Sequence, residues 1–339
     1  MQASLATNLQ RDRLEFVELV RRFAGATSDA ILDPSMQIFT FPGIEGFVSY
    51  RLEAQVVIVF GEPTCAEKDK PLLTRAFHKA MQSQSKNVIY ITASLAFSQW
   101  AIENVCSTMI EMGEELFFDP FRNPEKETGP QGSLVRRKVK RALRELVTVS
   151  EYQGDDLQIE KEIELVGSIW LKQRRGTQFH ISNVYLFQDR LGKRWFYAKK
   201  DDRIVGVVTI NQLHSQEGWL LNHLMTTPDA PVGTSELLIV SVFDFLRKEG
   251  CHLVTVGSAP AKTLGTITGL SKPSSWMVRS LFQFGRKLGR LDGLNMFWSK
   301  FQPQRKPTFI LFGRRLIGVR ELIALKRCLS GRSKGEQNG

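Results

Sequence analysis

The first 24 residues carry apolar side chains at helical spacing. The stripe consists of Leu14, Val17, Leu19, Val20 and Phe23. A period of three to four residues is typical of an amphipathic helix, so we predict one over residues 1–24. Residues 36–60 follow a different pattern, with apolar runs that read MQIFTF, GFVSYRLE and AQVVIVF. Such short runs, broken by turn residues, predict three strands.

The third of these strands begins a strand–helix–strand unit. The sequence GEPT at Gly61 ends the strand, because Gly and Pro favour turns. The following residues predict a helix over 68–84 and a strand over Asn87–Thr92. A second helix is predicted over 97–112, ending at Gly113.

A similar unit lies 165 residues further along the chain. It consists of the strand-like LLNHLMTTP, a helix and the strand-like LVTVGSA. Pro63 aligns with Pro228, and Val88 aligns with Leu253 in the same register. We therefore expect an internal duplication and two related α/β halves, with coincidence as the alternative. The loop from Pro228 to Ser235 would present the unpaired N–H groups of its helix to a substrate.

A basic segment separates the two halves. The irregular loop DPFRNPEKETGPQGS precedes LVRRKVKRALRELV, which has six basic residues, a single Glu145 and apolar residues at helical spacing. We predict a basic amphipathic helix here, capped by Gly132-Ser133. The predicted organisation is a first domain over 1–130, a linking helix over 131–150, a second domain over 151–328 and a disordered tail over 329–339.

The second half is predicted to contain further helices and hairpin strands. An acidic helix is expected over 155–174, followed by strands in VYLF and KRWFYAKKDDRIVGVVTINQLH with a turn at Asp201-Asp202. After the repeated unit, residues 276–291 predict a helix that mixes aromatic and basic side chains. The sequence GLNMFWSKFQPQRKPTFILF then predicts a helix, a loop and a strand.

Charge is distributed unevenly along the 339 residues. The net charge is +11, yet the segment from Lys262 to the end holds 16 basic and 3 acidic residues. The excess of positive charge therefore lies in the last quarter, which indicates an anionic partner such as nucleic acid or an acidic membrane surface. A solvated basic tail is the structural alternative.

Other features exclude several classes of protein. The four cysteines lie far apart without a CxxC pair, so their spacing predicts neither a zinc site nor a disulfide framework, and a reducing cytoplasm is expected. No run reaches about 18 uninterrupted apolar residues, so no membrane span is predicted. The N-terminal residues lack the apolar core of a signal peptide.

Several short motifs, in order along the chain, carry a family resemblance. They are GEP at Gly61, MGEELFFDPF at Met112, GSLVRRKVKRA at Gly132, LMTTPDAPVG at Leu224, GSAP at Gly257 and WSKFQP at Trp298. Over roughly residues 40–315 the chain resembles the soluble C-terminal domain of bacterial phosphatidylglycerol lysyltransferases, but not their membrane-spanning flippase half. The resemblance implies an α/β (α+β) fold of two tandem GNAT-like domains, each a mixed sheet flanked by helices.

The resemblance also implies a reaction. Such enzymes move an aminoacyl group from a charged tRNA to the glycerol hydroxyl of an anionic lipid. A hydroxyl attacks an activated ester, so the protein must position two substrates and stabilise an oxyanion. Aminoacyl-tRNA is the donor, and no metal or other cofactor is expected. A cytoplasmic enzyme, at most peripheral on the inner face of the membrane, would fit this role.

Two groups of residues are candidates for holding the amino acid. Asp229, in the second loop, offers a carboxylate to an amine, and His223 at the preceding strand end points toward the same region. Strand alternation would place Glu115 and Asp119 on one face, where two carboxylates suit an ammonium group. An ordinary turn residue, a packing histidine and a solvent-facing strand edge are the alternatives.

Further candidates are basic or aromatic. Those on the basic helix, suited to tRNA or lipid phosphates, are Arg136, Arg137, Lys138, Lys140 and Arg141. A solvated helix face is the alternative. The resemblance places Trp170 and Arg174, four residues apart on one helix, near the substrate, and gives Lys300 a position suited to a phosphate. Helix packing and an unpaired surface lysine are the alternatives.

The chain departs from the relatives at charged positions. They carry an acidic residue before the Leu224-Met225 pair and a basic one after it, where this chain has Asn222-His223 and Thr226-Thr227. After the KFQP-like stretch they carry WEPRY, where this chain reads QRKPTF from Gln304. The resemblance therefore does not fix lysine as the transferred amino acid.

Two other functions remain open. An acyl-CoA-dependent acyltransferase of the same fold would need a glycine-rich pyrophosphate cradle, whereas Pro228–Gly233 is poor in glycine and contains an acid. A non-catalytic protein that binds RNA or a membrane would explain the changed positions. The helix over 276–291 could then lie on anionic headgroups with its aromatic face inserted, or dock on the protein's own core.

Overall fold

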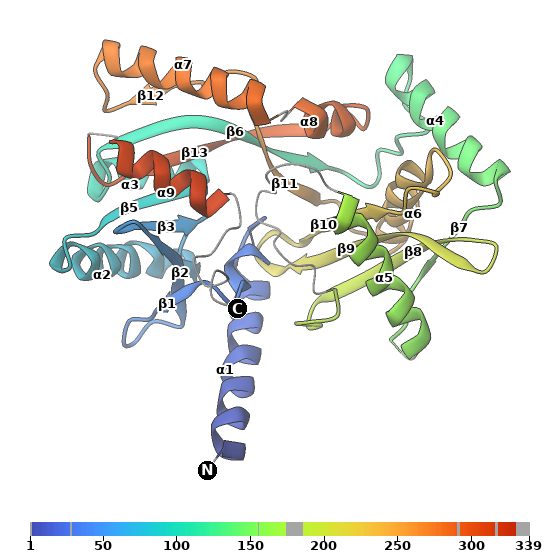
Figure 1. Cartoon of the computed structure of the whole chain (residues 1–339), viewed down its shortest axis with the longest axis horizontal. Helices are drawn as coiled ribbons and strands as arrows, with labels where there is room; N and C mark the ends of the chain where they lie inside the picture. The colour runs from blue at the N-terminus through green and yellow to red at the C-terminus, as the bar shows by residue number, and fades with distance from the viewer. Residues whose placement is uncertain are drawn as a thin grey trace.

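The computed structural model describes residues 2–27, 29–154, 156–173, 186–289, 292–315 and 318–329, with only the backbone for 2–12, 284–289, 292–294 and 329. Its described strands form one mixed sheet (Figure 1) in the order β1-β2-β3-β5-β13-β6-β11-β10-β9-β8-β7, with β4 beside β2 and β12 beside β6. The first six strands are β1 (Gln37–Phe39), β2 (Gly46–Glu53), β3 (Val56–Phe60), β4 (Thr64–Cys65), β5 (Asn87–Ala93) and β6 (Thr108–Phe118). The others are β7 (Thr148–Glu151), β8 (Lys193–Lys200), β9 (Arg203–Leu213), β10 (Gly218–Thr226), β11 (Val254–Pro260), β12 (Ile267–Thr268) and β13 (Gln304–Phe312).

Helices flank this sheet, which confirms the predicted mixed α/β class (Figure 1). The first four are α1 (Gln2–Phe23), α2 (Lys70–Ser83), α3 (Leu95–Asn104) and α4 (Gly129–Arg144). The next five are α5 (Leu157–Gln173), α6 (Thr234–Lys248), α7 (Lys272–Gly289), α8 (Asp292–Ser299) and α9 (Val319–Leu329). Helix α1 contacts both β4 and β9, so it bridges strands of the two halves.

The two predicted strand–helix–strand units have the same geometry. Strand β3 pairs with β5 in parallel across the connection through α2. Strand β10 pairs with β11 in parallel across the connection through α6. A parallel pair needs a crossover between its strands, and a helix supplies it in each case. Strand β6 pairs with β11 and thereby joins the two halves in one sheet.

The last part of the chain returns to the first half. Strand β13 lies between β5 and β6 and is antiparallel to both. Helix α9 contacts β2 and β3, and its buried Ala324 and Cys328 belong to the same core cluster as Val56 and Ile58. The end of the chain therefore completes the sheet of the first half.

Three local predictions are wrong. The helix predicted over 97–112 ends at Asn104, and residues from Thr108 onward form β6. The apolar residues of this segment fit both periods, and pairing with β11 and β13 selects the strand. Helix α4 begins at Gly129 rather than at the predicted Gly132-Ser133 cap, because Pro130 suits the first helical turn. In VYLF, residues 186–187 form no strand, and the first two residues lie outside the described ones.

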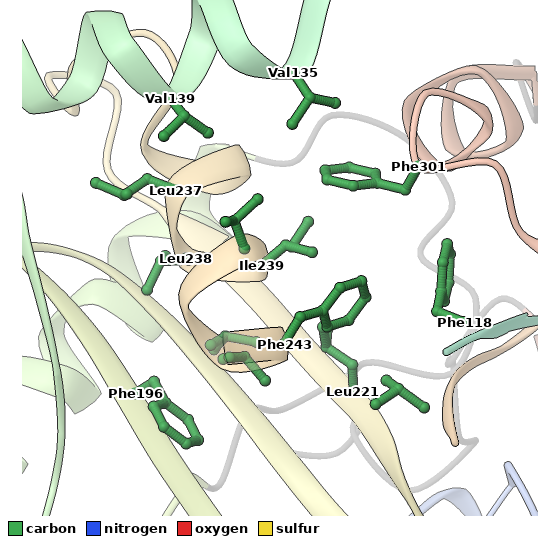
Figure 2. Packing of buried hydrophobic residues seen from close by; sticks show 14 of the residues in the cluster. Phe118, Val135, Val139, Phe196, Leu221, Leu237, Leu238, Ile239, Phe243 and Phe301 are labelled. Carbon is green, nitrogen blue, oxygen red and sulfur yellow. The ribbon is translucent and has the colours of Figure 1, made fainter. Parts of the chain in front are cut away.

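An apolar core fixes α6 and α4 on one face of the second half (Figure 2). Val135 and Val139 of α4 point at α6, whose Leu238 and Phe243 are buried against the sheet. Phe118 of β6 belongs to the same cluster, with its ring centroid 5.7 Å from that of Phe243. Leu116 of β6 lies in this cluster as well, so β6 turns Leu116 and Phe118 toward α6. Because side chains alternate along a strand, Glu115 and Phe117 face the opposite side of the sheet.

Candidate functional site

Polar side chains gather where β6, β11 and β13 lie side by side. Glu115 on β6 accepts a 3.0 Å hydrogen bond from the Thr255 hydroxyl on β11. Lys306 on β13 stands directly opposite Glu115 in the antiparallel register. Opposed residues project to the same side with Cβ atoms about 5 Å apart. Glu115, Thr255 and Lys306 therefore share the sheet face opposite the α6 core, and we call them the central triad.

The environment of Glu115 favours its protonated form. Burial raises the pKa of this carboxyl above its ordinary value. The Thr255 hydrogen bond and the charge of Lys306 act against this rise, whereas the nearby carboxylate of Glu62 adds to it. Lys306 itself is exposed, with its ammonium 4.5 Å from the centre of the Phe117 ring. A half-buried carboxyl of raised pKa thus lies beside an accessible cation.

An irregularity in β11 shapes the floor of this site. The β11–β6 register shifts between Thr255 and Ser258, and Gly257 adopts a φ of 81°. The Gly257 N–H donates to the Thr255 hydroxyl over 3.1 Å. Bulges of this kind occur beside active sites, where they re-aim side chains. Here the bulge places the Thr255 hydroxyl between the Gly257 amide and the Glu115 carboxylate.

The loop after α1 crosses the middle of the molecule close to the triad. A Cβ on Gly257 would lie 3.8 Å from the Ala26 carbonyl oxygen. A Cβ on Gly61 would lie 2.6 Å from the Thr27 hydroxyl, and the φ of 75° at Gly61 also requires glycine. The loop therefore touches both the GEP segment of the first half and the bulge of the second.

Asp29 anchors this loop in a cluster of buried charges. Its carboxylate contacts Arg21 at 3.0 Å and Lys193 at 3.2 Å, and it accepts a 2.6 Å hydrogen bond from Asn222 on β10. Burial alone would raise the pKa of Asp29, but Lys193 and Arg21 outweigh it and hold the pKa well below its ordinary value. The carboxylate is therefore charged at neutral pH.

His223 borders the Asp29 cluster. Its Nδ1 lies 2.9 Å from the Thr209 hydroxyl on β9. Burial lowers the pKa of His223, Asp29 opposes this shift and Lys193 adds to it, so that the pKa is about 4. The imidazole is therefore neutral near pH 7, and it supplies no negative charge at this position.

The predicted residues do not form one site. The register of β6, β11 and β10 places Asp119 beside the first residues of β10. Asp229 follows the last residue of β10, so the two carboxylates lie at opposite ends of this strand. Asp229 is exposed and pairs with Arg203 at 2.8 Å. Asp119 accepts the Phe121 N–H and lies 3.6 Å from His252. Glu115 and Asp119 are about 13 Å apart along the chain direction of β6, which is too far for both carboxylates to bind one ammonium group.

Other predicted residues lie away from the central triad. The Lys300 ammonium is buried, forms an ion pair with Glu236 and sits 3.9 Å from the centre of the Phe297 ring. Trp170 packs beside the core cluster under α5. Arg174 lies outside the described residues.

Helix α4 presents part of its basic face to solvent. Arg136 donates to the carbonyl oxygens of Glu125 and Glu127 over 2.7 and 2.8 Å, so it holds the preceding loop. Arg137, Lys140 and Arg141 are exposed. These three side chains, together with the half-buried Lys138, are placed to meet an external polyanion.

Sequence reasoning missed the Asp29 cluster and the role of Glu62 and Lys306. The GEP motif carried part of the family resemblance and the lysine in QRKPTF stood in a departure from it, but nothing in their local sequence predicted that they would lie near Glu115. Asp29 carries no motif and meets Asn222 across 193 residues of chain. Only the tertiary arrangement of strands and loops brings these groups together.

The described residues offer neither a metal site nor a membrane-spanning helix. They contain no cluster of three or more His, Cys, Asp or Glu side chains that could hold a metal ion. Within the same part of the chain, no helix is both long and apolar enough to cross a membrane.

Similarity to known proteins extends over most of the chain. A family model described as phosphatidylglycerol lysyltransferase, C-terminal, matches residues 26–312. The phosphatidylglycerol lysyltransferase of Staphylococcus haemolyticus is 20% identical over 301 residues, covering 84% of this chain and 34% of that protein. That of Staphylococcus aureus strain COL is 19% identical over 304 residues, covering 87% and 35%. The chain thus spans about a third of the length of these curated relatives.

Two solved structures share the fold. The C-terminal domain of a putative lysylphosphatidylglycerol synthetase from Agrobacterium fabrum superposes with a TM-score of 0.76 at 20% identity, covering 96% of this chain and 99% of that one. L-PGS from Bacillus licheniformis gives 0.73 at 18% identity, covering 95% and 97%. Together with the family model, which covers most of the sequence, these matches show that the chain belongs to the family of phosphatidylglycerol lysyltransferase C-terminal domains.

Proposed function

We propose that the chain transfers an aminoacyl group from aminoacyl-tRNA to a hydroxyl group of a phosphatidylglycerol-like lipid. Family membership supports lipid aminoacyl transfer in general. The observation that carries the proposal for this chain is the position of Lys306 opposite Glu115, beside Thr255, on the sheet face away from α6. The central triad is the proposed reaction centre.

The reaction needs one proton transfer and the stabilisation of one oxyanion. The acceptor oxygen bonds to the carbonyl carbon, the ester bond to the tRNA ribose oxygen breaks, and the hydroxyl proton moves to that ribose oxygen. Glu115, whose pKa burial raises, suits transient acceptance of this proton. The Lys306 ammonium suits the negative charge that develops on the carbonyl oxygen. Neither role requires a covalent enzyme intermediate.

The amino group of the donor also needs a partner. Glu62 lies close enough to Glu115 to raise its pKa, and it is itself held by Lys70 at 2.8 Å and by the Ser94 N–H at 2.9 Å. We assign to Glu62 the binding of the α-ammonium group. His223 is neutral near pH 7, so it provides no anionic contact for a lysyl side chain at the position where relatives carry an acid.

The donor tRNA would contact α4. Arg137, Lys140 and Arg141 are exposed on this helix, and each can neutralise one backbone phosphate. Acyl-CoA is a less favourable donor. A Cβ on Gly233, which precedes α6, would lie 2.0 Å from the Lys138 carbonyl oxygen, so α4 closely approaches the helix start where a pyrophosphate would bind.

The test is a transfer assay with a panel of tRNAs, each charged with a different radiolabelled amino acid. The purified chain is mixed with vesicles that contain phosphatidylglycerol, and label is measured in the chloroform extract. The proposal expects lipid-bound label from at least one charged tRNA and none from the free amino acid. Absence of label from every charged tRNA in the panel would refute it, and label from acyl-CoA instead would establish the rival donor.

A further inference from the structure

Helix α7 has apolar side chains on two opposite sides. On the inner side, Val278 and Phe282 pack against the core cluster of the first half. Arg279 fixes the same side by donating to the carbonyl oxygens of Leu264 and Gly265. On the outer side, the exposed fractions are 73% for Trp276, 49% for Met277 and 47% for Leu281. None of these three residues belongs to a buried core cluster.

The spacing of the outer residues places them on one face. Positions 276, 277 and 281 lie within one and a half turns and project from the same side of a helix. We call Trp276, Met277 and Leu281 the outer patch. Single exposed apolar residues are common, but adjacent large ones on one helix mark an interaction surface. Figure 1 shows α7 along an outer edge of the molecule, away from the other helices of the first half.

The sequence on either side of the outer patch carries only positive charge. Residues 262–291 contain six basic residues and no acidic one. A helix with apolar side chains on its free face and Lys and Arg around them fits the interface of a bilayer that contains anionic lipids. A protein partner would instead need matching acidic groups, and an RNA partner would not require the exposed Trp276 and Met277 side by side.

The connections of α7 attach it to strands that carry the central triad. Strand β12, which immediately precedes the helix, pairs Ile267 with Ile110 of β6. Helix α8, which follows it, is tied to β11 by a 2.7 Å hydrogen bond from Asn295 to the Pro260 carbonyl oxygen. Pro260 pairs with Gly113, two residues before Glu115. The segments on either side of α7 are thus fixed to β6 and β11, two of the three strands that carry the central triad.

We propose that α7 binds the surface of an anionic lipid bilayer, with the outer patch inserted among the headgroups. This inference rests on the proposed function, because the bilayer would present the lipid acceptor beside the central triad. The surrounding basic residues attract the bilayer, and the outer patch supplies the apolar contact. Soluble lipid monomers would not need this contact.

Vesicle co-sedimentation of the full chain tests the proposal. The vesicles are equimolar phosphatidylcholine and phosphatidylglycerol, with pure phosphatidylcholine for comparison. Trp276→Glu combined with Met277→Glu should lower binding to the mixed vesicles at least about tenfold, since two large apolar contacts are lost. The control is the double variant Leu157→Glu and Leu165→Glu on α5. These two leucines are 72% and 57% exposed, and the control adds the same negative charge as the α7 double variant. The control should bind within about twofold of the wild type.

Three results would overturn the proposal. The first is unchanged vesicle binding by the α7 double variant, and the second is an equal loss of binding in the α5 control. The third is a change in oligomeric state in the α7 variant alone, which would make the outer patch an interface between copies of the chain. Transfer to a short-chain, water-soluble phosphatidylglycerol separates this inference from the proposed function. The α7 variant should retain that transfer. If even the wild type lacks it but binds vesicles through the outer patch, the proposed function fails and the membrane surface stands.

Discussion

Asp29, in the loop after α1, accepts a 2.6 Å hydrogen bond from Asn222 of β10, a residue 193 positions away. This contact joins the N-terminal loop to the second half of the sheet. Arg21 and Lys193, with side chains only 2% and 4% exposed, depend on the Asp29 carboxylate for neutralisation. The loop that passes close to the central triad is thus held by buried charge pairs in addition to the apolar packing of Ala24 and Ile31 on either side of it.

Asp29→Asn should destabilise the protein by about 3 kcal/mol, because it leaves two buried cations without a counter-charge. Urea unfolding monitored by circular dichroism measures the loss. Glu45→Gln is the matched control, since the Arg22–Glu45 pair is more than half exposed on both sides. That change should cost less than about 1 kcal/mol. Equal effects of the two substitutions would contradict the assignment of Asp29 as a buried anchor.

Stability should fall as the pH drops from about 6.5 toward 4. Burial lowers the pKa of both His78 and His223 to about 4, from an ordinary value of 6.5. The unfolded chain binds protons in this window and the folded chain does not, so stability decreases with falling pH by up to about 1.4 kcal/mol per unit for each histidine. Urea unfolding at pH 7 and pH 5 checks this.

The histidine effect can be separated from other acid effects. His78→Gln combined with His223→Gln should flatten the difference between pH 7 and pH 5, whereas His252→Gln, at an exposed position, should leave it unchanged. The Asp29 carboxylate does not contribute to the difference between pH 7 and pH 5. Its pKa is lowered in the folded chain, so the stability that it provides is lost only below the pKa of an unfolded aspartate, about 4. A wild-type difference that survives in the double variant would assign the acid sensitivity elsewhere.

Removing one member of the Lys300–Glu236 pair should be worse than removing both. Both residues are more than nine-tenths buried, so Lys300→Met leaves an uncompensated carboxylate and should cost about 3 to 5 kcal/mol. Lys300→Met combined with Glu236→Leu should recover more than half of that loss in urea unfolding. Additive losses would show that Lys300 is not chiefly a structural cation. Full stability of the single variant would instead free Lys300 for the phosphate contact predicted from the sequence.

The exposed basic residues of α4 should determine how tRNA binding responds to salt. Replacing Arg137, Lys140 and Arg141 by alanine should reduce the slope of log Kd against log salt by roughly 2 to 3, because each residue neutralises about one phosphate. The control replaces Lys68, Arg75 and Lys79, which are exposed on the first half and remove the same charge. A slope that changes equally in both variants would show a general charge effect and no tRNA site on α4.

Much of the fold was predictable because its signals are local. The two parallel units follow from apolar runs, turn residues and helical periodicity at Val56–Thr92 and Leu220–Leu253. The error at residues 105–112 has the opposite origin. Met109, Ile110 and Met112 suit either period, and the choice of strand depends on pairing with β13, which lies nearly 200 residues later.

The candidate site was only partly predictable for the same reason. Strand alternation identified Glu115, but its partners come from β11, β13 and the segment after β3. Lys306 appeared in the sequence as a departure from relatives, and only strand register shows that it opposes Glu115. Asp119 looked equivalent to Glu115 by alternation, yet it follows the end of β6 and belongs to a turn.

The most direct test compares two adjacent glutamates on opposite faces of β6. Glu115→Gln should lower transfer from charged tRNA to lipid by about 100-fold or more, since it removes the proposed proton acceptor. Glu114→Gln, which breaks a partly exposed pair with Arg305 on the other face, should stay within about threefold of the wild type. Lys306→Met should follow Glu115→Gln, and Arg305→Met should follow Glu114→Gln. Wild-type rates in both Glu115→Gln and Lys306→Met would contradict the assignment of the central triad as the reaction centre.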